Sequence, residues 1–465
     1  MSSDAIELGV AKLVADGASD GVVAAFRHDA ALVSSGERGL IREADIESVR
    51  TLPALGELPD PGDDGAAALD ATVVVKLNGG LGTSMGMTRA KSLLEVKDGR
   101  SFLDIAAAQV LHLRERHAGA APRVPLVLMN SFATRADSLT ALAAIPGLAA
   151  DLPADLVQNR LPKLLDDGTF APATWPADPA LEWAPPGHGD LYAALAGSGM
   201  LDTLLERGYR YAFVSNADNL GAVLDERILA WFAEAELPFL MEVAERTAAD
   251  RKGGHVARRG DGRLLLREIA QTDAADLAAF GDIDRHRFFN TNSVWIDLRA
   301  LAGVLARDGF LELPLIVNRK TVDPADPQSP RVVQIETAMG AAIAAFAGSQ
   351  ALHVPRSRFA PVKTTDDLIV VRSDAYALDD EFRLTLAPRR AGTAPLVHLD
   401  PEWFRLVAGF EARFPAGVPS LVGCDALTVR GDVRFGRGVV ARGVVTVGEP
   451  GASTDVPDGA VLDGR

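Results

Sequence analysis

Cysteine is almost absent from this chain, with Cys424 as the only one among 465 residues. A single cysteine excludes an intrachain disulfide and any metal site built from several cysteines. The eight histidines are scattered, and none forms the His-x-x-x-His pair that would place two metal ligands on one helix face. We therefore expect Cys424 to be a buried structural thiol, and we expect no zinc site.

The chain also lacks long apolar runs and any excess of positive charge. No stretch approaches the roughly 18 apolar residues of a membrane span, and residues 1–4 have neither a basic start nor an apolar signal core. The formal net charge of −16 repels polyanions over long range, although it permits a local basic pocket for a small phosphorylated ligand. The sequence thus predicts a cytoplasmic protein that binds neither a membrane nor nucleic acid.

Composition divides the chain into three predicted parts. Residues 1–65 begin with apolar groups at helical spacing and end in an acidic segment rich in turn formers, which indicates a helical lead-in and an exposed linker. Residues 66–385 alternate β-branched runs with helical patterns, which predicts an α/β fold with a central, mainly parallel (mixed) sheet and flanking helices. Residues 386–465 repeat a valine or phenylalanine followed by glycine, which is typical of a small β-solenoid.

Within the middle part, the predicted strands mark where a ligand should bind. We expect strands over 71–77, 124–129, 211–215 and 239–243, and helices over 102–116, 131–142 and 224–235, with Ser131 capping the second helix. In such sheets ligands bind beyond the carboxyl ends of the strands. The glycine-rich segment after the first strand and the segment 216–219 after the third both occupy this position.

The glycine-rich segment reads Lys76-Leu77-Asn78-Gly79-Gly80-Leu81-Gly82-Thr83-Ser84-Met85-Gly86, with Lys91 a few residues later. Glycines after a buried strand expose backbone N–H groups to an anion, usually phosphate. The spacing matches neither a Walker A loop, since Lys91 follows alanine, nor a dinucleotide fingerprint, which is one residue shorter. A tight structural turn would require fewer glycines and no lysine. A phosphate-binding loop is the interpretation that remains.

This segment resembles the signature of the eukaryotic-type UDP-glucose pyrophosphorylases, which are UTP–glucose-1-phosphate uridylyltransferases. Further blocks are similar to that family in the same order, and the resemblance extends from about residue 30 to the C-terminus. These blocks are Trp183-Ala184-Pro185-Pro186-Gly187-His188-Gly189-Asp190, Ser215-Asn216-Ala217-Asp218-Asn219-Leu220-Gly221, Phe289-Asn290-Thr291-Asn292, and Val354-Pro355-Arg356-Ser357-Arg358-Phe359 with Pro361-Val362-Lys363-Thr364-Thr365. The resemblance implies that residues 66–385 form a Rossmann-like nucleotidyltransferase domain and that UTP and glucose 1-phosphate are the substrates.

The resemblance also assigns a role to particular residues. It implies that Lys91 and Lys363 are catalytic phosphate ligands and that Asp218 holds the Mg²⁺ cofactor. Magnesium is commonly bound by one or two carboxylates together with substrate phosphates, so a single aspartate is adequate. The implied nucleotide-binding residues are Leu77, Asn78, Gly79, Gly80, Lys91, Gln158, Gly187, Asp218 and Lys363. The implied sugar-binding residues are His188, Asn216, Glu268, Asn290 and Asn292.

Chemistry supports some of these roles independently. An amide such as Gln158 can donate to a uracil oxygen and accept from the ring N–H, although in isolation it could equally be a surface amide. Asp218 could be a turn or cap residue, His188 a structural hydrogen-bonding group, and Lys91 a solvated charge. Asn290 and Asn292 would share one face of a regular strand, which suits recognition of a polyol.

One departure and several alternatives remain open. Family members commonly have Lys-Gly-Pro-Lys where this chain has Thr88-Arg89-Ala90-Lys91. Sugar specificity is undecided among glucose, galactose and N-acetylhexosamine 1-phosphates, because one hydroxyl is discriminated only by pocket geometry. A nicotinamide-dependent oxidoreductase and a non-enzymatic sugar-nucleotide sensor are the alternative classes of function. The C-terminal part could support a homo-oligomer.

Overall fold

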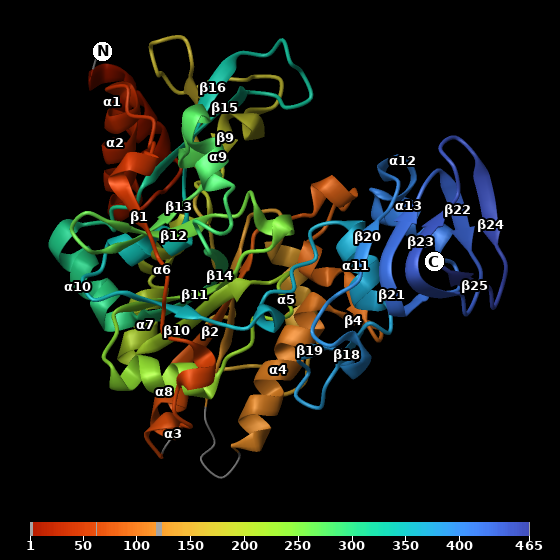
Figure 1. Cartoon of the computed structure of the whole chain (residues 1–465). Coiled ribbons are helices and arrows are strands. Elements are labelled where there is room, and N and C mark those ends of the chain that lie inside the picture. The colour runs from red at the N-terminus through yellow and green to blue at the C-terminus, as the bar shows by residue number, and fades with distance from the viewer. Residues whose placement is uncertain (1–2, 62, 118–122, 465) are drawn as a thin grey trace.

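The computed structural model describes residues 3–61, 63–117 and 123–464. A central sheet covered by helices forms the body of the molecule, with the N-terminal helices and the C-terminal strands at opposite ends (Figure 1). The helices are α1 (Ser3–Ala15), α2 (Asp20–Ser34), α3 (Asp63–Asp70), α4 (Phe102–Arg116), α5 (Arg135–Ala143), α6 (Leu191–Gly197), α7 (Met200–Glu206), α8 (Glu226–Glu234), α9 (Leu277–Phe280), α10 (Leu298–Asp308), α11 (Thr365–Arg372), α12 (Pro401–Phe404) and α13 (Val407–Arg413).

The central sheet is mixed, and its parallel half carries the glycine-rich segment. The strand order is β1-β12-β14-β10-β2-β5-β6, with β11, β13 and β17 paired beside this path. Strands β10, β2, β5 and β6 are parallel, whereas β14 runs antiparallel to β10. Their bounds are β1 (Ile46–Ser48), β2 (Thr72–Asn78), β5 (Leu126–Asn130), β6 (Asp155–Val157), β10 (Tyr211–Asn216), β11 (Phe239–Glu245), β12 (His255–Arg259), β13 (Leu264–Arg267), β14 (Phe288–Asp297) and β17 (Gln350–His353).

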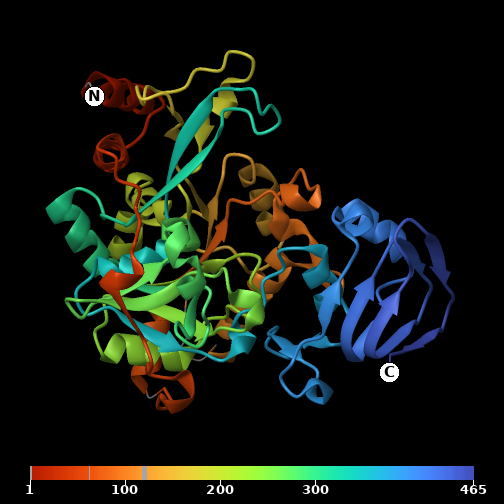
Figure 2. The ribbon, with the colours of Figure 1, turned by 45° about the horizontal axis from the view of Figure 1, so that its top comes forward.

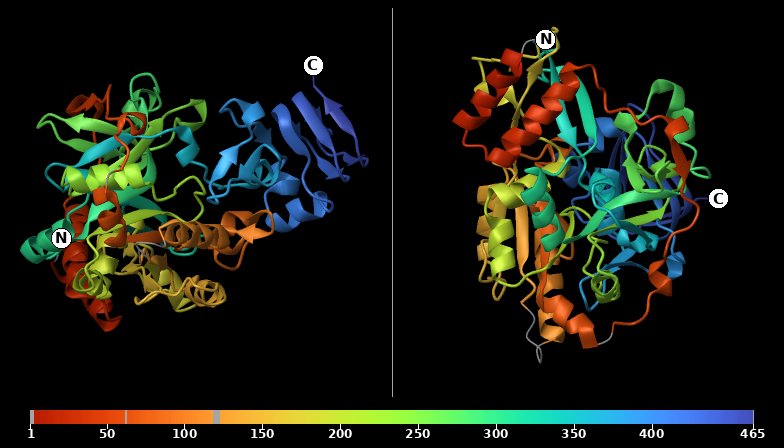
Figure 3. Two further views of the ribbon diagram at one scale, coloured as in Figure 1. Left: turned by 90° about the horizontal axis from the view of Figure 1, so that it is seen from below. Right: turned by 90° about the vertical axis from the view of Figure 1, so that its left-hand side faces the viewer.

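Both faces of this sheet are buried, as the continuous β-branched run of β2 requires. Val74 packs in the layer formed with α3, α4, α5 and α8. Val73 and Val75 point the other way, into the layer formed with α6, α7 and α10. An apolar strand without polar alternation is therefore stable only between two helical layers. The views in Figure 3 show these helices around the sheet, with α4, in orange, reaching toward the C-terminal strands.

The two N-terminal helices form a separate apolar cluster at the edge of the molecule. Val10, Leu13 and Phe26 pack with Leu161 and Val333 from short strands that lie outside the central sheet. Figure 2 shows the hairpin of β15 and β16 next to these helices. The strands of this part are β7 (Leu161–Pro162), β8 (Leu164–Leu165), β9 (Trp183–Ala184), β15 (Leu315–Thr321) and β16 (Arg331–Thr337).

The C-terminal strands are parallel and share a core with the glycine-rich segment. Strands β20, β21, β23 and β25 form one sheet, and β22 pairs with β24. Their apolar cluster includes buried Cys424, and it continues to Met85 of the glycine-rich loop and Phe102 of α4. The bounds are β20 (Leu396–His398), β21 (Ser420–Val429), β22 (Asp432–Phe435), β23 (Val440–Val447), β24 (Ser453–Val456) and β25 (Val461–Asp463). Two further two-stranded sheets are formed by β3 (Glu95–Lys97) with β4 (Arg100–Ser101) and by β18 (Tyr376–Leu378) with β19 (Leu384–Leu386).

Most of the predicted elements are confirmed, including the α/β class, the central sheet with flanking helices and the buried Cys424. Ser131 is not the cap of α5, because its backbone N–H and hydroxyl bind Thr134 in a turn and the helix begins only at Arg135. The segment predicted as an exposed linker, apart from Gly62, which lies outside the described residues, buries Leu55 and Leu58 against the sheet layer of Val74. Among the described helices, none is long and apolar enough to cross a membrane.

Candidate active site

The glycine-rich loop begins at the carboxyl end of β2, and its last residues fold back onto its first residues. Gly82 and Gly86 have φ angles of 66° and 74°, a left-handed conformation that favours glycine. The backbone N–H of Lys91 donates to the carbonyl oxygen of Gly80 at 3.0 Å and closes the loop. The side chain of Asn78 points into the sheet layer, where it donates to Asn130 and Ser138. The backbone of this loop, rather than its side chains, is thus available to a ligand.

A cavity of about 370 Å³ lies at this edge of the sheet. Most of the site residues that the sequence predicts line this cavity, because β2, β5 and β10 are parallel and end side by side. The predicted residues that line it are Leu77, Asn78, Gly79, Gly80, Lys91, Gln158, Gly187, His188, Asn216 and Asp218. Ser92, Met129, Pro185 and Ala217 complete the lining.

Gln158 forms one wall of the cavity and lies directly against the glycine-rich loop. A β-carbon on Gly79 would lie 2.6 Å from Oε1 of Gln158, so a larger residue at this position would displace the Gln158 amide. The backbone N–H of Gln158 donates to the carbonyl oxygen of Asn130 at the end of β5. The next residue, Asn159, donates its backbone and side-chain N–H groups to the carboxylate of Asp190 at 2.6 and 2.8 Å. The backbone at Gln158 is therefore anchored on one side to Asn130 and, through Asn159, on the other side to Asp190.

His188 is neutral and presents a donor to the cavity. Its Nδ1 accepts a hydrogen bond of 2.8 Å from the backbone N–H of Met339, which leaves the proton on Nε2. Burial lowers the pKa of His188 to about 4. A neutral histidine with a fixed tautomer can donate to a sugar or phosphate oxygen, but it supplies no positive charge near neutral pH.

Lys91 and Asp218 form an ion pair in the cavity. Nζ of Lys91 lies 2.6 Å from Oδ2 of Asp218, and their side chains are 14% and 24% exposed. Asp218 follows β10, whose end is joined to β2 by a hydrogen bond of 3.0 Å from Ala217 N–H to the Leu77 carbonyl oxygen. A lysine and an aspartate that face one cavity can bind phosphate and a cation respectively.

The carboxylate of Asp218 offers one oxygen to a cation. No described residue hydrogen-bonds to Oδ1 of Asp218, and the described residues contain no cluster of three or more His, Cys, Asp or Glu side chains that could hold a metal. One carboxylate oxygen fits a cation that takes its remaining ligands from phosphates and water. The site thus suits Mg²⁺ that arrives with a nucleotide rather than a metal held by protein ligands alone.

Lys363 lies next to the cavity but does not line it. Its side chain is exposed, and the residue before it, Val362, donates its N–H to the carbonyl oxygen of Asp218 at 3.2 Å. Asn219 joins the same two segments by accepting from the N–H of Ala360 at 2.9 Å. The structure therefore brings the backbone of Lys363 to the rim of the site and leaves its side chain in solvent.

Glu268, Asn290 and Asn292 also lie outside the cavity lining. The regular alternation predicted for the two asparagines is wrong, because the pairing register of β14 with β11 shifts here and Asn292 has a φ of 56°. The amides nevertheless meet, since Nδ2 of Asn290 donates to Oδ1 of Asn292 at 2.8 Å. Burial raises the pKa of Glu268, while the charge of Lys363 acts to lower it.

Sequence reasoning missed two residues at this site. Ser92 lines the cavity with a buried hydroxyl that has no hydrogen-bond partner among the described residues. Asp190 anchors Asn159 and thereby the wall that contains Gln158. The position of Ser92 directly after Lys91 was a usable signal for the first, and the second ends the motif at 183–190, where the sequence assigned it no role.

Comparison with known proteins agrees with this geometry. The family model described as UTP–glucose-1-phosphate uridylyltransferase matches residues 27–442. The enzyme of that name from Hordeum vulgare is 40% identical over 421 residues, which cover 90% of this chain and 86% of the relative. The one from Saccharomyces cerevisiae is 40% identical, with 85% and 77% covered.

Solved structures give the same result. A variant UDP-glucose pyrophosphorylase from Leishmania major in complex with UDP-glucose has 46% identity and a TM-score of 0.93, with 100% of this chain and 99% of that chain covered. A structure from Trypanosoma brucei has 45% identity and a TM-score of 0.87, with both chains fully covered. The chain therefore belongs to the UTP–glucose-1-phosphate uridylyltransferase family.

Proposed function

We propose that this protein catalyses the reversible transfer of a uridylyl group from UTP to glucose 1-phosphate, which gives UDP-glucose and pyrophosphate. Membership of the family supports the reaction class. The observation that carries the proposal is a single cavity in which Gln158 lies against Gly79, and which also contains the charged pair Lys91 and Asp218 and the neutral donor His188. This cavity contains groups suited to a nucleobase, to phosphates and to a sugar.

The reaction needs no nucleophilic side chain. An oxygen of the sugar phosphate attacks the α-phosphorus of UTP in line, a P–O bond forms, and the bond to the β-phosphate oxygen breaks as pyrophosphate leaves with its electron pair. The second pKa of a phosphate monoester lies near about 6, so the attacking group is largely ionised at neutral pH. The protein must bring two polyanions together and stabilise the charge of the transition state.

This requirement indicates which groups of the cavity bind the nucleotide. We assign the backbone N–H groups of 77–80 and Gly187 to the nucleotide, and Gln158 to the uracil edge, where an amide can donate and accept at once. Lys91 neutralises phosphate oxygens, and Lys363 does so when its exposed side chain folds over the rim. Opposite charge near the developing transition state contributes more in a cavity than in bulk water.

The sugar side is assigned to the neutral polar groups. Nε2 of His188 donates a hydrogen bond, and Asn216 at the end of β10 faces the same cavity. Asn290 and Asn292 reach the sugar from the neighbouring segment, because the amide of Asn290 packs against Gly340 and the preceding Met339 binds His188. Glu268 would accept from a sugar hydroxyl next to Lys363.

Mg²⁺ is the proposed cofactor, with Asp218 as its protein ligand. When bound, it neutralises charge on the phosphates of the nucleotide. The ion pair with Asp218 holds the ammonium group of Lys91 close to the phosphate oxygens that it would bind.

A pyrophosphate-release assay tests the proposal. The purified protein is incubated with Mg²⁺ and each combination of four nucleoside triphosphates with glucose, galactose and N-acetylhexosamine 1-phosphates. We expect the highest kcat/KM for UTP with glucose 1-phosphate. Absence of pyrophosphate in every combination would refute the proposed reaction and favour a sugar-nucleotide sensor. Thermal stabilisation by NAD but not by UTP would instead favour the oxidoreductase.

We further propose three parts in the chain, at 1–65, 66–385 and 386–465, in a cytoplasmic protein. The parallel pairing of β20, β21, β23 and β25, and of β22 with β24, supports a small β-solenoid in the last part. Glycines with left-handed φ lie at its corners, for example Gly431, Gly438 and Gly448. The turns between short coils require this conformation.

The same part is the proposed surface for a homo-oligomer. Leu396 in β20 and Val444 in β23 are 56% and 60% exposed, and both align with Ala426 of the strand between them. An exposed apolar row on a parallel sheet suits the same row of a second copy. Light scattering of the wild type and of the Val444→Asp variant, at several concentrations, tests this proposal, which fails if both are monomers throughout.

A further inference from the structure

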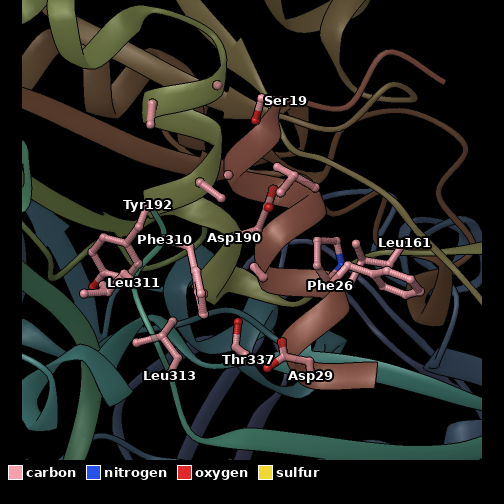
Figure 4. A pocket seen from close by; sticks show the side chains of 18 of the residues that line it. Ser19, Phe26, Asp29, Leu161, Asp190, Tyr192, Phe310, Leu311, Leu313 and Thr337 are labelled. Carbon is pink, nitrogen blue, oxygen red and sulfur yellow. The ribbon is translucent and has the colours of Figure 1, made fainter. Parts of the chain in front are cut away.

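A second cavity lies behind the wall that carries His188, between α2, α6 and the segment 309–313. Its volume is about 290 Å³. Figure 4 shows the aromatic and aliphatic side chains around it, including Phe26, Leu161 and Phe310, with Asp29 and Asp190 among them. A cavity of about 150 Å³ is enough for a benzene ring. This one therefore has room for an aromatic ring and a short substituent.

The charge of the lining is entirely negative. Four carboxylates line the cavity, from Asp20, Asp29, Asp190 and Glu336, and none of the described lining residues is lysine, arginine or histidine. Asp190 is satisfied by Asn159. Asp29 has no hydrogen bond or ion pair with any described residue, and burial together with the nearby charge of Glu312 raises its pKa to about 7.

These features determine the chemistry of a matching ligand. An anion would have to lose its hydration next to several carboxylates, which is unfavourable. A purely apolar ligand would leave the Asp29 carboxylate without a partner when it is ionised. A cation with an apolar body satisfies both the carboxylate and the apolar walls.

The cavity shares a wall with the active site. The short segment 187–190 turns Gly187 and His188 toward the first cavity and Gly189 and Asp190 toward the second. Gly189 packs so closely against Thr337 that a β-carbon would lie 2.2 Å from its hydroxyl oxygen. A ligand in the second cavity would therefore restrain the backbone that positions His188 and, through Asp190 and Asn159, Gln158.

We propose that this cavity binds a small organic cation, an aromatic or branched aliphatic group that carries a protonated amine, with the ammonium on Asp29. Occupancy stabilises the wall at 187–190 and so strengthens UTP binding in the active site. The binding step is independent of the proposed function, whereas its effect on UTP rests on that function. The two are separable because amine binding is measured without nucleotide and the reaction by pyrophosphate release.

Calorimetric titration of the full-length protein with 2-phenylethylammonium at pH 8 tests the binding step. The matched probes are 2-phenylethanol, which is neutral, and 3-phenylpropionate, which is anionic. We expect the ammonium to bind at least tenfold more tightly than the alcohol, and the anion not to bind. Equal affinity for all three probes would overturn the proposal. Absence of ammonium binding at concentrations up to about 10 mM would overturn it as well.

Variants locate the site. Asp29→Asn keeps the shape of the side chain and is expected to weaken ammonium binding at least tenfold, with unchanged basal activity. Asp20→Asn, on the same helix, serves as the control and should change the affinity less than threefold. Ala25→Leu fills the cavity and should abolish binding of both the ammonium and the alcohol. Wild-type affinity in Asp29→Asn would show that the amine binds elsewhere.

Coupling and pH give two further readouts. Saturating UTP should lower the Kd of the amine about fivefold, and the amine should lower the Kd of UTP by the same factor because linkage is reciprocal. An unchanged Kd would refute the coupling.

Amine affinity should fall from pH 8 to pH 6 as Asp29 is protonated, whereas an increase would contradict its role. The other titratable groups that face or flank Asp29 are Asp20, His28, Asp190, Glu312 and Glu336.

Discussion

The ion pair of Lys91 and Asp218 permits a quantitative test of the site. At 2.6 Å, the gross Coulomb attraction is about 6 kcal/mol for an effective dielectric constant of about 20. Desolvation of two side chains that are at most one quarter exposed offsets much of this energy. We therefore expect a coupling free energy of about 1–3 kcal/mol between the two residues.

A double-mutant cycle measures this coupling. Lys91→Met, Asp218→Asn and the double variant are unfolded in urea without ligands, and the stability losses of the two single variants should sum to about 1–3 kcal/mol more than the loss of the double variant. In the pyrophosphate assay, Lys91→Met should lower kcat/KM by about 10²–10³, the effect of removing one group that stabilises transition-state charge.

A neighbouring cation provides the matched control. Arg89 lies two residues before Lys91, and its side chain is exposed and does not line the cavity. Because Arg89 is not assigned to phosphate binding, Arg89→Met should change kcat/KM by less than about threefold, which corresponds to under 1 kcal/mol. The reasoning fails if the stability losses of the cycle add within about 0.5 kcal/mol, or if Arg89→Met is as damaging as Lys91→Met.

Four further perturbations test other parts of the structure. Gln158→Ala should raise KM for UTP about tenfold to hundredfold, since two hydrogen bonds of about 0.5–1.5 kcal/mol each are lost, while KM for the sugar phosphate stays within twofold in steady-state kinetics. Lys363→Ala should lower turnover by orders of magnitude with an unchanged circular dichroism spectrum, and wild-type turnover would exclude its proposed role. Glu242→Gln breaks the fully buried pair with Arg358, whose two hydrogen bonds are both 2.7 Å, and should cost about 3–5 kcal/mol of unfolding free energy, measured in urea. Burial raises the pKa of Asp29 from 3.8 to about 7, so the folded state binds more protons between these values and stability falls as pH rises. Asp29→Asn should consequently be about 1–4 kcal/mol more stable than wild type at pH 8 and equal to it near pH 4, and the opposite pH trend would contradict this assignment.

Local sequence patterns were sufficient for the elements that present the nucleotide loop. The β-branched run at 73–75 predicts a strand buried on both faces, and it occurs as β2 between two helical layers. The glycines after it predict an exposed backbone, and Gly82 and Gly86 adopt the left-handed conformation that other residues disfavour. Both inferences depend on neighbours within a few residues, and so they can be read from the chain itself.

Two other predictions were wrong, one at a turn and one at a strand pairing. The sequence predicted Ser131 as a helix cap, but Thr134 satisfies its polar groups and the helix starts later. The regular strand predicted at 290–292 contains a shift in register, because β11 and β14 pair with different spacing on either side of it. Alternation along one strand carries no information about residues that are left without a partner on the neighbouring strand.

The sequence by itself determined the family, the α/β class and the chemical types of the groups in the first cavity, because these follow from motif identity and local periodicity. Only the tertiary structure decided that Lys91 pairs with Asp218, that Asp190 holds the wall of Gln158, and that Lys363 remains outside the cavity lining. It also created the second cavity, whose lining comes from α2, α6 and β16. Contacts between such distant segments arise from the packing of the whole chain, and no local pattern records them.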